Sequence, residues 1–327
     1  MGNFRLKHRS LKHKSLKHRS FLYLSMVILV DVLFFCSLNG IGTPSVAFRN
    51  NVVLIQNEDW FWNTPELNSV LENNLPGVVS NLDKNLFSTA IIFLGNIYPN
   101  GSIVQERSDS QLQSAIDAFH NRGIRVYLWV ENNGFPPNID ANHRGAIYSQ
   151  IVAILNNVGA DGYFDDIEND QIPSDSSYRQ VWLDYENNGS IALHSIGKSW
   201  TVAYGIDWVT NINSYLNVDT IYTMFYSEGI SSFEDSANID GFWQENFGVG
   251  AFSGFVPASP VVPIVMVNGF EGEKPLSFQL NEISCLLNAY GSWSRIDGVG
   301  VWLYETTTNQ DWQTLGDFNL NPLGLER

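Results

Sequence analysis

The amino-acid sequence predicts an α/β fold, a single (β/α)8 barrel that follows an N-terminal leader. Three observations support this: eight apolar runs of strand length, helical patterns between most of them, and no long low-complexity linker within residues 48–327. Continuous apolar strands alternating with helices are typical of parallel sheets covered by helices. The count of eight and the even spacing favour a closed barrel; a doubly wound open sheet is the alternative.

Two segments precede this expected domain. Residues 1–20 carry the pentad repeat LKHRS-LKHKS-LKHRS and hold seven of the 18 Lys and Arg residues. Residues 21–47 are mostly apolar, contain Asp31, and end in the small-residue exit Ser45-Val46-Ala47. A basic segment, an apolar segment and a small-residue exit resemble a secretory signal, and an uncleaved membrane anchor is the alternative. We therefore expect an extracellular or cell-surface protein that contacts a membrane only through this leader.

The charge balance argues against nucleic acid as a partner, and the cysteine count argues against a disulfide and a cysteine-based metal site. Without the seven basic residues and Asp31 of the leader, 11 bases stand against 33 acids, a formal net charge of −22. Such a surface repels nucleic acid. Cys36 lies in the leader and leaves only Cys285, so neither an intrachain disulfide nor a cysteine-based metal site is expected in the processed chain. No cofactor is expected.

The first half of the domain shows the strand and helix patterns in alternation. The four expected strands are apolar runs at residues 51–56, 86–97, 124–130 and 161–168. Apolar residues at helical spacing predict one helix over 110–119, closed by Asn121-Arg122-Gly123, and another with Ile147, Ile151, Ile154, Leu155 and Val158 on one face.

The second half continues the alternation. Its expected strands are residues 200–205, 218–226, 261–267 and 298–304. Helices are predicted over 178–196, with an interruption near Asn187-Asn188-Gly189, over the run that carries Leu276, Leu280, Ile283 and Leu287, and over 309–318. Residues 230–259 lack a clear period and predict a long loop after the sixth strand, on the face where barrel enzymes bind substrate.

Acidic and aromatic residues gather at the carboxyl ends of the expected strands. The acids are Glu58, Asp59, Glu131, Asp166, Glu168, Glu228 and Glu305. The aromatics are Trp60, Trp62, Trp129, Tyr204, Trp208, Tyr226, Trp302 and Tyr304. Barrel sites are built at these ends. Carboxylates move protons and stabilise an oxocarbenium-like centre, and aromatic rings present flat apolar faces to sugars, so the combination predicts a carbohydrate site.

The stretch 161–170, D-G-Y-F-D-D-I-E-N-D, is the most informative of these strand ends. Because strand side chains alternate between faces, Phe164, Asp166 and Glu168 share one face and Asp165 belongs to the other. Two carboxylates on one face of a half-buried strand require a purpose, since an unpaired charge is costly there.

This stretch resembles the D-G-x-D-x-D-x-E motif of family 18 glycoside hydrolases, with Phe164 in place of the first inner Asp. Two further stretches are similar in order. Tyr222-Thr-Met224-Phe-Tyr226-Ser227 looks like the sixth-strand M-x-Y-D, with Ser227 for Asp, and Val299-Gly-Val-Trp302 looks like the last strand. The resemblance implies a secreted hydrolase that cleaves glycans containing N-acetylglucosamine.

The resemblance also implies roles for individual residues. Glu168 is expected as the general acid, Asp166 as the residue that orients the N-acetyl group, and Tyr226 as its hydrogen-bond partner. The N-acetyl carbonyl oxygen is then the nucleophile, so no enzyme nucleophile is required. The expected substrate-binding residues are Trp302, Met224, Trp129, Phe164, Glu131 and Glu305.

Three alternatives stay open. A barrel that has lost turnover would bind carbohydrate only, because Phe164 and Ser227 replace two carboxylates of the family pattern. A glycosidase of another family would pair Glu168 with one of the acids at other strand ends, Glu58, Glu131, Glu228 or Glu305. A hard cation held by oxygen ligands from Asp165, Asp166, Glu168 and Asp170 is the third.

Overall fold

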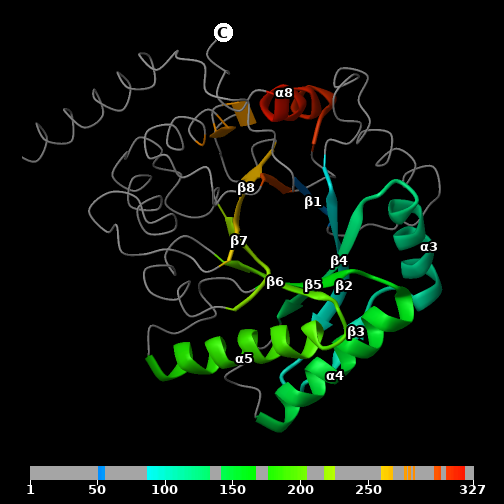
Figure 1. Ribbon diagram of the computed structural model, residues 1–327, viewed down its shortest axis with the longest axis vertical. Helices are drawn as coiled ribbons and strands as arrows, with labels where there is room; N and C mark the ends of the chain where they lie inside the picture. Colours follow the sequence, from blue (N-terminus) through cyan, green and yellow to red (C-terminus); the bar gives the residue numbers. More distant parts are fainter. Residues whose placement is uncertain are drawn as a thin grey trace, which may run out of the picture.

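The computed structural model is a closed barrel of parallel strands with helices outside it (Figure 1). It describes residues 51–55, 87–132, 141–166, 176–204, 217–224, 259–267, 276–277, 279–280, 283, 298–302 and 307–320. The leader, the first-strand acids Glu58 and Asp59, and all of the expected loop 230–259 except Ser259 lie outside these residues.

Eight parallel strands form the barrel wall. They are β1 (Val52–Ile55), β2 (Thr89–Ile97), β4 (Arg125–Asn132), β5 (Gly162–Asp166), β6 (Ser199–Tyr204), β7 (Thr220–Met224), β8 (Val261–Met266) and β9 (Gly300–Trp302). β1 pairs in parallel with both β9 and β2, which closes the sheet on itself. The predicted barrel is confirmed, and the doubly wound alternative is wrong because such a sheet has two free edges.

A ninth strand, β3 (Ile103–Gln105), runs antiparallel to the end of β2 and was not predicted from the sequence. The register of β2 against β4 shifts between Phe93 and Gly95, and Gly95 has a φ of 152°. A Cβ at Gly95 would lie 2.0 Å from the Val104 carbonyl oxygen. Glycine is therefore required where the two strands approach, and after the bulge β2 pairs with β3 as well as with β4.

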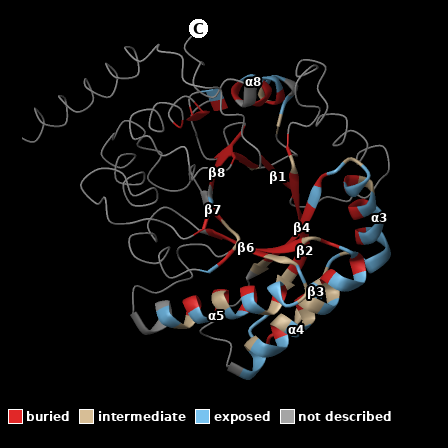
Figure 2. Ribbon diagram, viewed as in Figure 1, coloured by how far each residue is buried: buried red, intermediate tan, exposed pale blue. Residues whose placement is uncertain are grey.

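The described helices follow the predicted positions. They are α3 (Asp109–His120), α4 (Ala141–Val158), α5 (Ser176–His194) and α8 (Asn309–Leu320). The α3 helix begins with a capping box between Ser108 and Gln111 and buries the predicted stripe of Leu112, Ala115, Ile116 and Phe119. Leu276, Leu280 and Ile283 are helical and buried, as their spacing predicts. Figure 2 shows buried residues along the inner sides of the helices and exposed ones outside.

The predicted interruption near Asn187-Asn188-Gly189 is wrong, because α5 is one continuous helix from Ser176 to His194. Gly189 lies against the indole ring of Trp200 on β6, and a Cβ there would come within 2.4 Å of the ring. The glycine thus allows α5 to approach the sheet closely. A glycine in a helix can mark either a break or a close approach to another element. Here the residue that distinguishes the two is Trp200, which lies in the next strand and not in the helix.

Strand alternation divides the apolar core into two clusters. Residues inside the barrel form an inner cluster that includes Tyr127, Trp129, Phe164 and Tyr222. Residues between the strands and the helices form a larger outer cluster that includes Tyr163. The predicted assignment of Phe164 and Tyr163 to opposite faces is confirmed, since β5 pairs with β4 and β6 without a register shift.

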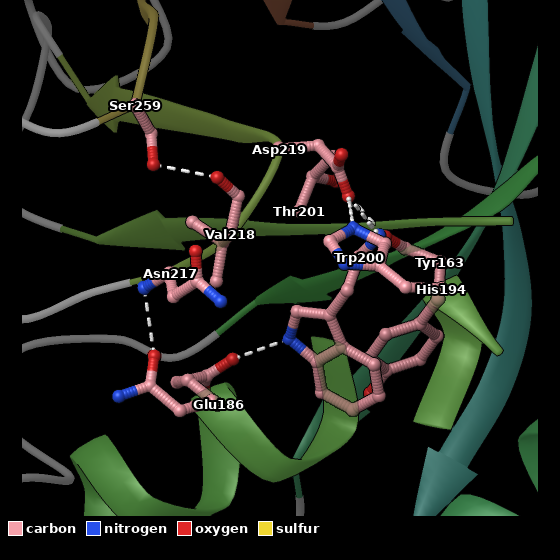
Figure 3. Close-up of polar contacts among 10 residues, drawn as sticks. Tyr163, Glu186, His194, Trp200, Thr201, Asn217, Val218, Asp219 and Ser259 are labelled. Carbon is pink, nitrogen blue, oxygen red and sulfur yellow. Dashed lines mark hydrogen bonds and ion pairs between the residues drawn. The ribbon is translucent and has the colours of Figure 1, made fainter. Parts of the chain in front are cut away.

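Two similar polar contacts tie helices to strands at the amino ends of the strands. Asp161 Oδ2 accepts hydrogen bonds from the Val126 amide at 2.8 Å and from His120 Nε2 at 2.7 Å. Asp219 Oδ2 accepts from the Trp200 amide at 2.8 Å and from His194 Nε2 at 2.9 Å (Figure 3). Each contact joins the last residue of a helix to the strands that follow it, so these aspartates have a structural role.

Among the described residues, no helix combines the length and the apolar character that a membrane span needs.

Candidate functional site

The candidate site lies at the carboxyl ends of β4 and β5, where two acids stand side by side. Glu131 and Asp166 are register partners on these adjacent parallel strands. Neighbouring strands are roughly 4.8 Å apart, so the two side chains start from neighbouring backbone positions. Both acids follow inner-cluster residues by two positions, Glu131 after Trp129 and Asp166 after Phe164, so both belong to the inner face.

The two acids differ in exposure. Asp166 is 4% exposed, whereas Glu131 is half-buried. Burial raises the pKa of the Glu131 carboxyl, and the negative charge of Glu106 raises it further. A carboxyl with a raised pKa keeps its proton to a higher pH than an ordinary glutamate, which is the direction that favours a general acid.

An aromatic floor lies one layer below these acids. The Trp129 ring has three aromatic neighbours, with ring centroids at 5.2 Å from Phe93, 6.2 Å from Phe164 and 5.0 Å from Trp302. Tyr222 continues the floor from β7, 5.3 Å from Phe164. These rings meet at inclined angles, the favoured geometry for packed aromatic side chains.

The predicted aromatic residues take different places in this floor. Trp129 and Phe164 are 0% exposed, so they support the layer above them and present no face to solvent. Trp302, at the end of β9, is only partly buried. Phe93 and Tyr222 were not predicted as site residues. The apolar alternation of Ile91 and Phe93 was the available signal for Phe93, and Tyr222 lies in the stretch that resembles the sixth strand of the family.

The first two residues of the D-G-Y-F-D-D-I-E stretch have structural tasks at the opposite end of the barrel. Asp161 accepts the two hydrogen bonds described above. A Cβ at Gly162 would lie 2.7 Å from the Ser199 carbonyl oxygen, so only glycine fits between β4 and β6. The stretch therefore builds the strand with its first residues and supplies the candidate site with its later ones.

Asp165 points away from the barrel interior, as strand alternation predicts. It is 0% exposed and accepts a hydrogen bond from the Tyr163 hydroxyl at 2.6 Å. Asp165 and Asp166 lie on opposite faces of β5 and cannot ligate one ion together, which weakens the cation alternative. Within the described part of the chain, no three His, Cys, Asp or Glu side chains are grouped to hold a metal ion.

The side chains of the remaining predicted residues lie outside the described part of the chain. Glu168, Tyr226 and Glu305 lie outside the described residues. The backbone of Met224 ends β7 and is the register partner of Ile264, but its side chain lies outside the described part. The structure thus brings together Asp166, Glu131, Trp129, Phe164 and Trp302 at one end of the barrel.

The fold and this arrangement define a (β/α)8 barrel with an acidic and aromatic carboxyl end, and the barrel is similar to those of solved chitinases. A chitinase from Bacteroides thetaiotaomicron superposes with a TM-score of 0.61 at 14% identity, over 86% of this chain and 98% of that chain. Class V chitinase from Nicotiana tobaccum, solved in complex with NAG4, has a TM-score of 0.55 at 10% identity, over 83% and 99%.

A second kind of enzyme shares the fold. The spore cortex-lytic enzyme SleL from Bacillus megaterium has a TM-score of 0.60 at 8% identity, over 84% of this chain and 75% of that chain. No protein-family model matches the sequence, and no curated protein matches it. At such identities the likeness establishes the barrel fold alone and leaves the activity to be argued from the site.

Proposed function

We propose that this protein is a secreted glycoside hydrolase of family 18 type that cleaves glycans containing N-acetylglucosamine. The observation that carries the proposal is Asp166, an acid 4% exposed on the inner face at the carboxyl end of β5, above the floor formed by Trp129 and Phe164. The similarity of the fold to chitinases supports the same class of substrate.

The proposed mechanism uses the substrate's own N-acetyl group. By the alternation that places Phe164 and Asp166 inside, Glu168 is expected on the same face and protonates the glycosidic oxygen. Asp166 holds the N-acetyl group so that its carbonyl oxygen attacks the anomeric carbon and forms an oxazolinium. Tyr226 would hydrogen-bond that carbonyl, and Trp302 would support the sugar ring. Water then opens the oxazolinium, so stereochemistry is retained without a covalent enzyme intermediate.

The half-buried Glu131 has a role in this scheme that the family pattern does not supply. Phe164 occupies the place of the first inner Asp and cannot share a proton with Asp166. Glu131 is the register partner of Asp166, and burial raises the pKa of its carboxyl. We expect its protonated form to donate a hydrogen bond to Asp166 or to the N-acetyl group.

The test is hydrolysis of a panel of N-acetylated glycans by the wild type and by Glu168→Gln. Removing the general acid should lower turnover by a factor on the order of 10² to 10⁴. The variant should keep the circular dichroism spectrum and the thermal midpoint of the wild type. Turnover at the wild-type rate in the variant would rule out the assignment of Glu168.

A two-carboxylate glycosidase is the second candidate, and the inward position of Glu131 favours it. In that scheme Glu131 pairs with Glu168, and the enzyme itself supplies the nucleophile or the base. A thiazoline mimic of the oxazolinium distinguishes the two mechanisms, because it should inhibit only substrate-assisted hydrolysis. A protein that binds chito-oligosaccharides and releases no product would instead be a binding barrel, the outcome that Phe164 and Ser227 favour.

We further propose that residues 21–47 direct export. The basic residues 1–20, the apolar run and the exit Ser45-Val46-Ala47 support this assignment. Expression of the full chain followed by N-terminal sequencing tests it: a mature end near residue 48 in the extracellular fraction is expected. A chain that stays in the membrane fraction with its first residues intact would show an anchor instead.

A further inference from the structure

Two acidic side chains are completely buried in the layer between the strands and the helices, one on β5 and one on α5, which packs on the neighbouring strand β6. Asp165 on β5 and Glu186 on α5 are each 0% exposed. The Tyr163 hydroxyl donates a hydrogen bond to Asp165 Oδ1 at 2.6 Å. The indole Nε1 of Trp200 donates to Glu186 Oε2 at 2.6 Å (Figure 3). Two ionised carboxylates in such a site would be very costly, because burial disfavours each charge and the charges repel.

A single proton on one of the two carboxyls removes the repulsion between them. The charge of Asp165 acts directly on Glu186, and two ionised carboxylates have no donor with which to hydrogen-bond each other. The second oxygens of the two groups, Asp165 Oδ2 and Glu186 Oε1, are both buried, and no donor within the described part of the chain reaches Glu186 Oε1. A proton on Glu186 Oε1 lets this group donate to Asp165 while its Oε2 accepts from Trp200. Asp165 then carries the single negative charge.

The electrostatic surroundings agree with a protonated Glu186. Burial is the main cause that raises the pKa of Glu186, the charge of Asp165 raises it further, and the Trp200 hydrogen bond lowers it. Three tyrosines face the pair: Tyr163 from β5, Tyr185 from α5 and Tyr148 from α4. Burial raises the pKa of each of these hydroxyls, so they stay neutral near neutral pH.

We propose that Asp165 and Glu186 are a positioning pair that shares one proton, fixes the carboxyl end of β5 against α5, and thereby sets the direction of Asp166. Asp165 and Asp166 are consecutive and face opposite sides of the same strand. A movement of the β5 backbone that separates Asp165 from Glu186 therefore also moves Asp166 within the barrel. The inference goes beyond the proposed function, because it applies equally to a hydrolase and to a binding protein.

The pair makes stability depend on pH in a defined direction. The pKa of Glu186 is higher in the folded state than in the unfolded state, so its contribution to stability is fully present below the unfolded value. That contribution is lost as pH rises through the folded value, because the folded protein must then hold two buried charges or release the pair. We expect the thermal midpoint to fall as pH rises from the unfolded-state pKa of Glu186 to its folded-state pKa.

Glu186→Gln is the variant that tests the shared proton. A glutamine amide donates to Asp165 and accepts from Trp200, and it does not titrate. Asp184→Asn is the matched control, because Asp184 is an exposed acid on the same helix. In the full-length protein, the pH-dependent fall of the thermal midpoint should persist in Asp184→Asn and be lost in Glu186→Gln. A fall of the same size in Glu186→Gln would overturn the shared proton.

Carboxyl carbon NMR tests the positioning itself. With aspartate and glutamate labelled at the side-chain carboxyl, the Glu186 resonance should titrate well above the ordinary glutamate range. The Asp166 resonance, assigned with Asp166→Asn, should shift at that same pH in the wild type and not in Glu186→Gln. An Asp166 chemical shift that stays unchanged while Glu186 titrates would overturn the positioning role.

A second variant keeps the test valid where Glu186→Gln fails to fold. In Asp165→Asn the neighbouring charge is removed and the new amide donates to Glu186. The Glu186 resonance should then titrate at a lower pH than in the wild type. An unchanged titration would show that Asp165 and Glu186 do not share a proton.

Discussion

Phe164 shows how one residue changes the chemistry of a strand. It is 0% exposed and packs against Trp129 and Tyr222. A carboxyl at this position would lie among aromatic rings, where its charged form is strongly disfavoured. The floor of the candidate site is thus apolar, and the acids beside it among the described residues are Asp166 and Glu131.

Phe164→Asp, which restores the family motif, is expected to destabilise the protein. Loss of the ring removes packing worth about 3–5 kcal/mol, and the buried carboxyl adds a further cost. The introduced carboxyl has a raised pKa in the folded state, so stability should be lost as pH rises through that value. Urea unfolding at acidic and neutral pH measures the effect.

Phe164→Leu is the matched control, because it shortens the side chain without adding a titratable group. Its free energy of unfolding should be lower than that of the wild type by an amount that is similar at both pH values. Equal stability of Phe164→Asp and the wild type would show that the site accepts a carboxyl and would reopen the family mechanism at this position.

At the opposite end of the barrel, Asp161 and Asp219 each hold a helix end and a strand together. Each accepts a backbone amide and a histidine that ends a helix. Asp161→Ala should lower the free energy of unfolding by about 1–3 kcal/mol, because it leaves the Val126 amide without an acceptor. Asp219→Ala, which does the same to the Trp200 amide, should have a similar effect, measured by chemical unfolding.

Asp311 provides a useful comparison for these aspartates. It caps α8 through the Thr308 amide at an exposed site, where water replaces the lost acceptor. Asp311→Ala should therefore have a smaller effect than Asp161→Ala. A larger effect at Asp311 would contradict the structural role of Asp161.

At the scale of the element, two helical glycines differ in the space around them. A Cβ at Gly145 in α4 would meet no atom within 4 Å, whereas a Cβ at Gly189 in α5 would overlap the Trp200 ring. The backbone context is helical in both cases. Helix propensity therefore favours alanine at both positions, and packing opposes it at only one.

Gly145→Ala should raise the free energy of unfolding by about 0.5–1 kcal/mol, because alanine restricts the unfolded chain and favours the helix. Gly189→Ala should instead lower it by about 1–3 kcal/mol, because α5 must move away from β6. Thermal unfolding of the two variants beside the wild type measures both signs. Stabilisation by both substitutions would show that α5 does not pack closely on Trp200.

Elements that follow from a local sequence pattern could be predicted. Features that depend on a contact with another element could not. The apolar stripe of α3 and its capping box are local patterns, and the structure follows them. The close approach of α5 to β6 depends on Trp200, and β3 depends on its pairing with Gly95, Asn96 and Ile97 of β2. Both partners lie in another element, and no local pattern identifies them.

At the scale of the whole molecule, closure of the barrel depends on the seam formed by β9, β1 and β2. The Val52 amide donates to the Val299 carbonyl oxygen at 3.0 Å, and Asn51 Oδ1 accepts from the Val299 amide at 3.0 Å. The Asn51 carbonyl oxygen accepts from the Ser88 amide at 2.9 Å. Asn51 therefore connects both sides of the seam, joining segments nearly 250 residues apart in sequence.

The acidic balance of the whole chain also has a measurable consequence. With 11 bases against 33 acids after the leader, like charges repel across the surface. The thermal midpoint of the processed domain should therefore rise as salt is added from low to physiological concentration, because salt screens the repulsion. Duplex DNA should not bind at low salt. A midpoint that falls with salt would contradict net self-repulsion.

The sequence by itself determined the barrel, because eight apolar runs alternating with helical stripes leave few ways to bury their surfaces. Period-two alternation also determined that Phe164 and Asp166 share one face of their strand and that Asp165 lies on the other. Only the tertiary structure decided that Glu131 is the register partner of Asp166 and that Glu186 is buried where the charge of Asp165 acts on it. These pairings join residues from different elements, and strand register and helix packing, which set them, depend on the whole folded chain.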